Sequence, residues 1–138
     1  MKIVIVMGSD SDFPVVEKGY KILKEFGVET DVRVISAHRT PFEALEFARN
    51  AYKNGYELII AAGVLAGCTT VPVIGLPIKS SELDGMDALL SIVQMPPGVP
   101  VATVGINAAE NAALLAVQIL SVKYEELRHK FLDYKKQM

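Results

Sequence analysis

The chain has 138 residues, a length that suits one domain. With 51% hydrophobic and 22% charged residues it can bury a core, which excludes a disordered chain. The formal net charge of −2 gives no reason to expect a nucleic-acid partner. A single cysteine, Cys68, excludes an intrachain disulfide and fits a reducing compartment.

The apolar opening, residues 1–7, is too short to cross a membrane. It runs into polar Gly8-Ser9-Asp10 rather than into a small-residue cleavage site. We therefore expect a cytoplasmic protein with no membrane partner. The mean hydropathy of +0.31 is high for a small monomer, and it predicts apolar surface covered by other subunits.

Strand and helix patterns alternate along the chain. Residues 2–7 form a continuous β-branched run, typical of a strand buried on both faces of a parallel sheet. A polar turn follows, and a helix with Asp12 as its N-cap and Pro14 in its first turn ends before Gly27. Further strands are predicted at 30–35, 58–62, 71–76 and 100–104. Helices are predicted at 41–54, at 86–93 and from about 108. A final helix is predicted to carry an apolar stripe of Tyr124, Leu127, Phe131 and Tyr134.

This alternation predicts a single domain over 1–138 with a three-layer α/β/α fold. The expected core is a flavodoxin-like, doubly wound parallel sheet of about five strands, followed by long C-terminal helices. One junction is too short: only eight residues separate Ala62 from Val71, whereas a parallel crossover needs a dozen or more. Either these strands are joined unusually or residues are absent near 62–64, and we favour absence.

Two polar loops follow the first two strands, where open α/β sheets bind ligands. In Gly8-Ser9-Asp10-Ser11-Asp12, glycine permits close approach, hydroxyls donate hydrogen bonds, and free amides at a helix start favour an anion such as phosphate. The carboxylates suit ribose hydroxyls, because an ionised Asp cannot donate to phosphate. The same residues would equally suit an ordinary turn with Asp and Ser as helix caps.

The second loop is Ser36-Ala37-His38-Arg39-Thr40, with Thr40 placed to cap the helix that begins at Pro41. A histidine beside an arginine at a strand end combines a side chain that can transfer a proton with a guanidinium group that can bind an anion through two hydrogen bonds. A surface loop with a solvated arginine is the alternative. Lys79-Ser80-Ser81 and the proline-stiffened segment 91–100 are placed to frame the same cleft, although the latter would also serve as a rigid connector.

No convincing metal cluster is evident from the sequence. His129 lies in a Lys/Glu-rich helix and is expected to be solvated. Cys68 lacks a nearby base, which favours a small core residue over a nucleophile.

Taken together and in order, these loops resemble those of the class I PurE family. The matching segments are 8–12, 36–41, Ser91-Ile92-Val93-Gln94-Met95-Pro96 and Asn111-Ala112-Ala113-Leu114-Leu115-Ala116, within a resemblance that runs from Met1 to about Leu120. The resemblance implies a mutase that converts N5-carboxyaminoimidazole ribonucleotide to 4-carboxy-5-aminoimidazole ribonucleotide in purine biosynthesis. Carbon dioxide would be released, held in a closed site and recaptured by the ring, without metal or organic cofactor.

The resemblance also implies residue roles. His38 matches the catalytic histidine, which shuttles the proton between the ring carbon C4 and nitrogen. The remaining matches are ribonucleotide contacts: Ser9, Asp12 and Arg39 as main ones, with Ser11, Ser36, Ala37 and Gly8 in support.

The sequence departs from the family pattern at the short junction. Family members carry a Gly/Ala-rich loop with a second histidine before a segment like Val64-Leu65-Ala66-Gly67, which here follows Ala62-Gly63 directly. The alternative functions are a class II-type carboxylase acting on aminoimidazole ribonucleotide and a non-catalytic, flavodoxin-like nucleotide-binding module.

The C-terminal helices lead to an expectation about assembly. The helix from Ala108 to Leu120 is apolar nearly all round, so it should be buried on every side. The helix after it has an apolar stripe that also needs a surface to pack on, and the chain's own sheet is already covered by other helices. We therefore expect a closed homo-oligomer, an octamer by the resemblance.

Overall fold

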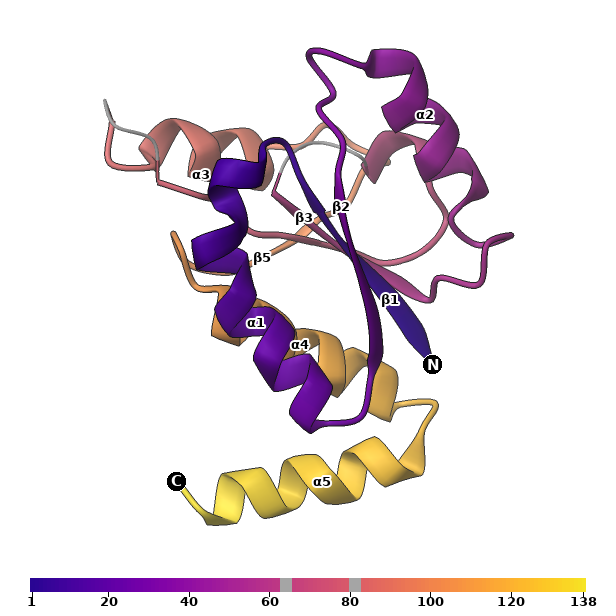
Figure 1. The fold of residues 1–138 in the computed structure, drawn as a ribbon, viewed down its shortest axis with the longest axis vertical. Helices are drawn as coiled ribbons and strands as arrows, with labels where there is room; N and C mark the ends of the chain where they lie inside the picture. Colours follow the sequence, from indigo (N-terminus) through magenta and orange to yellow (C-terminus); the bar gives the residue numbers. More distant parts are fainter. Residues whose placement is uncertain (63–65, 80–82) are drawn as a thin grey trace.

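The computed structural model describes residues 1–62, 66–79 and 83–138 (Figure 1). Strands and helices alternate through most of the chain, as the sequence pattern predicts. In chain order the elements are β1 (Lys2–Met7), η1 (Asp10–Asp12), α1 (Phe13–Glu25), β2 (Glu29–Val34), α2 (Pro41–Asn50), β3 (Leu58–Ala62), η2 (Ala66–Cys68), β4 (Val73–Gly75), α3 (Met86–Val93), β5 (Ala102–Thr103), α4 (Ala109–Ser121) and α5 (Glu125–Lys136).

The five strands form one parallel sheet in the order β2-β1-β3-β4-β5, which confirms the predicted flavodoxin-like topology. β4 and β5 are shorter than the apolar runs that predicted them. Val104 still donates its amide to the Gly75 carbonyl, at 3.4 Å, but the pairing of these two strands goes no further. The order places β3 at the centre and β1 between β2 and β3, so the chain passes from β1 to β2 on one side and returns to the other side of β1 through β3.

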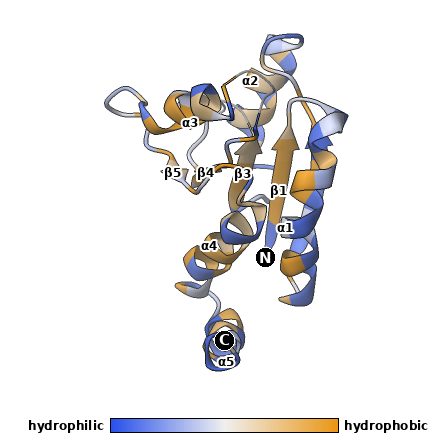
Figure 2. Cartoon of the chain, turned by 90° about the vertical axis from the view of Figure 1, so that its left-hand side faces the viewer, coloured by the Kyte–Doolittle hydropathy of each residue, from blue (hydrophilic) through white to orange (hydrophobic). Residues whose placement is uncertain are grey.

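Alternate residues of the strands point to opposite faces, and both faces are covered by helices. Ile3, Ile5 and Met7 of β1 pack into a core with α1, α4 and α5, whereas Val4 and Val6 pack on the other side with α2. Figure 2 shows β1 and β3 in hydrophobic colours between helices of mixed hydropathy. In the described ranges, no helix is long and apolar enough to cross a bilayer.

The C-terminal helices pack within the chain, so the expectation that the α5 stripe lacks a surface of its own is wrong. Leu127 is fully buried, and the rings of Phe131 and Tyr134 lie 6.3 and 6.0 Å from the ring of Phe26, just beyond α1. The stripe needs no face of the sheet, because α4 and the end of α1 together provide an apolar surface. These helices therefore give no argument for assembly.

The connection between β3 and β4 is unusually short for two parallel neighbours. The two strands are parallel neighbours, and the chain crosses between them through η2. Where this connection is described, it contains no α-helix. The interruption expected near 62–64 falls largely on residues 63–65, which lie outside the described residues.

Candidate active site

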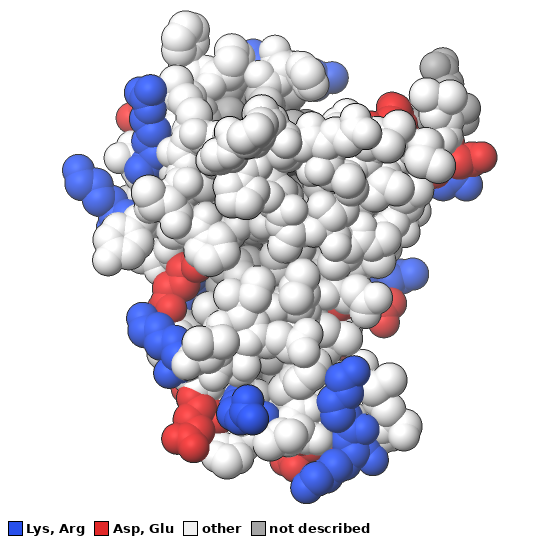
Figure 3. Space-filling view, turned by 180° about the vertical axis from the view of Figure 1, so that it is seen from behind, with Lys and Arg blue, Asp and Glu red and all other residues white. Residues whose placement is uncertain are grey.

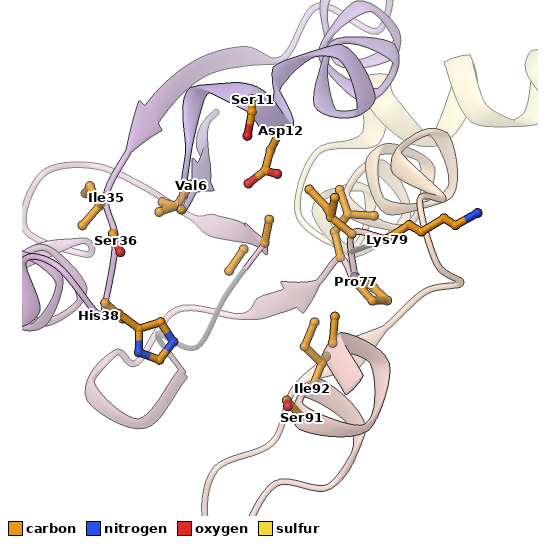
Figure 4. Close-up of a pocket in the computed structure, with 17 residues that line it drawn as sticks. Val6, Ser11, Asp12, Ile35, Ser36, His38, Pro77, Lys79, Ser91 and Ile92 are labelled. Carbon is orange, nitrogen blue, oxygen red and sulfur yellow. The ribbon is translucent and has the colours of Figure 1, made fainter. Parts of the chain in front are cut away.

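A cavity of about 640 Å³ lies at the carboxyl ends of the strands (Figure 4). Its walls come from the ends of β1, β3 and β4, the segment after β2, and α3. This is the position at which open α/β sheets bind ligands, beside the point where the chain reverses its direction through the sheet. The lining residues are Val6, Gly8, Ser11, Asp12, Ile35, Ser36, Ala37, His38, Ala61, Ala62, Leu76, Pro77, Ile78, Lys79, Ala88, Ser91 and Ile92.

The loop after β1 places Gly8, Ser11 and Asp12 on the cavity wall, whereas Ser9 does not line the cavity. The Ser9 hydroxyl oxygen accepts a hydrogen bond from the Ser11 amide at 3.2 Å and lies 2.9 Å from the Ser11 hydroxyl. Ser9 thus caps the short η1 helix. In this structure its side chain holds the turn that presents Ser11.

Asp12 occupies the N-cap position of α1, as the sequence predicted, but its side chain makes no capping hydrogen bond. Its carboxylate points into the cavity instead (Figure 4). Burial raises the pKa of Asp12 above its ordinary value, and the backbone amide of Ser9 lowers it in part. A carboxylate in this position can accept hydrogen bonds from ligand hydroxyl groups.

The loop after β2 is held by a compact set of hydrogen bonds around Ser36. The Arg39 amide donates to the Ser36 hydroxyl oxygen at 3.1 Å, and the Thr40 hydroxyl donates to the Ser36 carbonyl at 3.0 Å. Thr40 occupies the N-cap position of α2, but its side chain makes no capping bond, so that detail of the prediction is wrong. The turn directs His38 over the cavity (Figure 4), whereas Arg39 is exposed and does not line it.

The third wall contains residues that the sequence placed near the cleft and others that it did not. Lys79 and Ser91 line the cavity, as their positions suggested, while Ser80 and Ser81 lie outside the described residues. The Lys79 ammonium lies 3.5 Å from the Asp84 carboxylate. Ile92 lies in the segment 91–100 that was expected to frame the cleft, whereas the other apolar members of this wall, Leu76, Pro77, Ile78 and Ala88, were missed. The end of β4 was the signal that could have found the first three of these.

The described part of the chain contains no group of three or more His, Cys, Asp or Glu side chains that could hold a metal ion. Cys68 is exposed, which corrects the expectation of a core residue. His129 lies 3.8 Å from Glu125 along the surface of α5. The side chains at the cavity that can transfer a proton are His38 and Asp12, beside the hydroxyls of Ser11, Ser36 and Ser91. The Lys79 side chain extends away from the cavity (Figure 4).

Fold and site together define a doubly wound α/β protein with a ligand cavity at the carboxyl ends of its strands, whose described lining includes a histidine and a carboxylate. A family model described as AIR carboxylase matches residues 2–138. The chain therefore belongs to the AIR carboxylase family, in agreement with the resemblance of its loops to PurE.

Individual relatives agree with this assignment. The N5-carboxyaminoimidazole ribonucleotide mutase of Pyrococcus abyssi is 55% identical over 145 positions, covering 99% of this chain and 83% of the relative. The mutase of the same name from Thermotoga maritima is 50% identical, covering 99% and 85%. The crystal structure of Treponema denticola PurE has a TM-score of 0.86 at 29% identity, covering 99% and 90%.

The length of one alignment bears on the short β3–β4 connection. The match to the Pyrococcus abyssi protein extends over 145 positions, which exceeds the 138 residues of this chain by seven. The relative therefore contains residues that have no counterpart here. This agrees with the expectation that residues are absent from this chain.

Proposed function

We propose that this chain is an N5-carboxyaminoimidazole ribonucleotide mutase of purine biosynthesis and that it works as one domain over residues 1–138. The observation that carries the proposal is the meeting of His38 with Ser11 and Asp12 around one cavity, in a chain about half identical to proteins of that name. This cavity offers a proton carrier and hydroxyl-binding groups, as the carboxyl transfer requires.

In the proposed mechanism, the protonated His38 gives its proton to the substrate nitrogen as the N-carboxyl group leaves as carbon dioxide. The ring carbon C4 then attacks the carbon dioxide, and the neutral imidazole of His38 takes the proton that C4 loses. The histidine ends as it began, and the reaction is an isomerisation without net proton change. The apolar wall formed by Ile78, Ala88 and Ile92 suits the retention of an uncharged molecule between the two steps.

The ribonucleotide is proposed to bind along the two polar loops. The hydroxyl groups of Ser9 and Ser11 would donate hydrogen bonds to the phosphate, and the Asp12 carboxylate would accept hydrogen bonds from the ribose. Arg39 lies outside the cavity lining, so its contact would require the guanidinium to reach across the rim. Gly8, Ser36 and Ala37 would contribute close backbone approach. No metal or organic cofactor is assigned a step.

The test is an assay of purified protein with N5-carboxyaminoimidazole ribonucleotide and, separately, with aminoimidazole ribonucleotide and bicarbonate. Turnover of the first substrate without ATP and in excess chelator supports the proposal. Turnover of the second substrate alone would identify a class II-type carboxylase. Ligand binding without turnover of either substrate would identify a non-catalytic nucleotide-binding module and refute the proposed mechanism.

We also propose a homo-oligomer, an octamer by family resemblance, because α3 exposes apolar side chains beside the cavity. Met86, Leu90 and Val93 are between 47% and 54% exposed, and their spacing places them along one side of the helix. Figure 3 shows a second supporting feature, a face on which charged side chains lie mainly at the periphery. Light scattering after size exclusion should give several times the 15.0 kDa mass of the chain. A monomer at micromolar concentration would refute this.

A further inference from the structure

One wall of the cavity continues beyond the sheet and needs hydrogen-bonding partners on one side. Leu76, directly after β4, donates its amide to Ala61 of β3 at 2.9 Å. On the other side, β5 contains only two residues. Directly after them, the Val104 amide donates a hydrogen bond to the Gly75 carbonyl. The next residues of the wall, 77–79, still line the cavity, and their backbone groups require partners.

Asn107 provides these partners, from the turn that precedes α4. Its amide donates to the Pro77 carbonyl at 2.8 Å, and its side-chain oxygen Oδ1 accepts from the Lys79 amide at 2.8 Å. In a parallel ladder, a residue bonds in this way to the residues before and after its opposite neighbour. Asn107 therefore pairs with Ile78 like a strand residue, although it belongs to no strand.

The side-chain oxygen takes the place of a main-chain carbonyl in this arrangement. The carbonyl of Asn107 itself accepts from the Ala109 amide at 2.9 Å, at the start of α4. The backbone is left-handed at Asn107, with φ of 59°. Asn and Asp adopt this conformation more readily than other side chains, and both carry an oxygen two bonds beyond Cβ.

We infer that Asn107 is a positioning residue for the binding cavity. It does not line the cavity, but it fixes the backbone of residues 77–79 and ties this wall to the first turn of α4. Its effect on the reaction rests on the proposed function, whereas its effect on the wall does not.

The first experiment measures hydrogen exchange of the Lys79 amide by NMR in three variants. Asn107→Gly keeps a residue that tolerates the left-handed backbone but loses Oδ1, so the Lys79 amide should exchange faster. Asn107→Asp retains an acceptor oxygen and should keep the amide protected. Asn54→Gly is the matched control, because Asn54 is exposed near the opposite ends of the strands. Unchanged exchange of Lys79 in Asn107→Gly would overturn the inference.

The second experiment measures KM and kcat for the mutase substrate. Asn107→Gly should raise KM about 3- to 10-fold, the effect expected from losing one neutral hydrogen bond, with a smaller change in kcat. Asn107→Asp should keep KM closer to that of the wild type, and Asn54→Gly should leave it unchanged. Equal effects of the two Asn107 variants would overturn the inference. Absence of turnover in the wild type would refute the proposed function instead, and the exchange experiment would still decide the role of Asn107 in the wall.

Discussion

Gly75 of β4 allows α3 to lie close to the sheet, and Gly75→Ala should destabilise the protein and distort the cavity together. A Cβ at this position would lie 2.2 Å from Ile92 Cγ2 and 3.0 Å from Val101 Cγ1. Carbon atoms pack at about 3.5–4.0 Å, so Ile92 has to move by more than about 1 Å. Ile92 is only 6% exposed and cannot turn into solvent without moving the helix.

The magnitude follows from two opposing effects. Overpacking in a core costs about 1–3 kcal/mol, whereas replacing a glycine gains about 0.4–1 kcal/mol by restricting the unfolded chain. We expect a net loss of about 1–2 kcal/mol in the free energy of unfolding. Because Ile92 and Ser91 of α3 line the cavity, a shift of about 1 Å should lower kcat/KM by up to about 100-fold.

The assay is urea unfolding of a double-mutant cycle, combined with activity measurements. Ile92→Ala removes the clashing methyl group and alone should cost about 2–5 kcal/mol. The double variant should be more stable than the sum of the two single effects predicts, by about 1–3 kcal/mol. Gly67→Ala is the control, since its Cβ would meet Val99 at an ordinary 3.9 Å. Wild-type stability of Gly75→Ala, or strict additivity in the cycle, would refute the reasoning.

Three further predictions concern the site and the assembly. His38→Asn should lower kcat by about 10²–10⁴-fold while leaving ligand affinity by calorimetry within a few-fold, because a general acid–base group is lost; near-normal turnover would exclude that role. Since the pKa of Asp12 is raised, the folded protein binds more protons than the unfolded chain just above the ordinary Asp pKa, and its stability falls as pH rises through that window. Asp12→Asn should therefore melt higher than the wild type at pH 7, with a gain that shrinks toward pH 4, and should bind the ribonucleotide more weakly; an equal melting temperature at pH 7 would contradict this. Leu90→Asp should give a smaller species in light scattering, because Leu90 is 47% exposed on the apolar side of α3 and a charge there would disfavour its burial between subunits; an unchanged mass would show that this side of α3 is not an interface.

The sequence predicted features that are set by local patterns. The β-branched run of β1 and the alternation of strands and helices were sufficient for the sheet and its order. The convergence of Asp12 and His38 followed from the same topology, because the ends of neighbouring parallel strands meet at one edge.

Features that depend on distant partners could not be predicted in this way. The apolar stripe of α5 identified the face that is buried but not the surface that covers it, which is the end of α1 and α4. The caps expected from Asp12 and Thr40 failed because other groups compete for the same side chains. Asn107 gave no sequence signal, since its role arises only when β5 ends early and leaves Lys79 without a strand partner.

The contacts that hold α5 to the fold lie at a distance from the cavity. This helix lies far from α2 and α3 in Figure 1, and it is joined to the remainder of the chain by bonds such as that from the Lys130 ammonium to the Phe26 carbonyl, at 3.1 Å. The Tyr124 hydroxyl, directly before α5, donates to Glu57 at 2.5 Å, at the opposite ends of the strands from the cavity. None of these residues lines the cavity. Selection can therefore change the melting temperature through this helix, as a lineage moves between hot and temperate habitats, while the chemistry at the other end of the sheet stays the same.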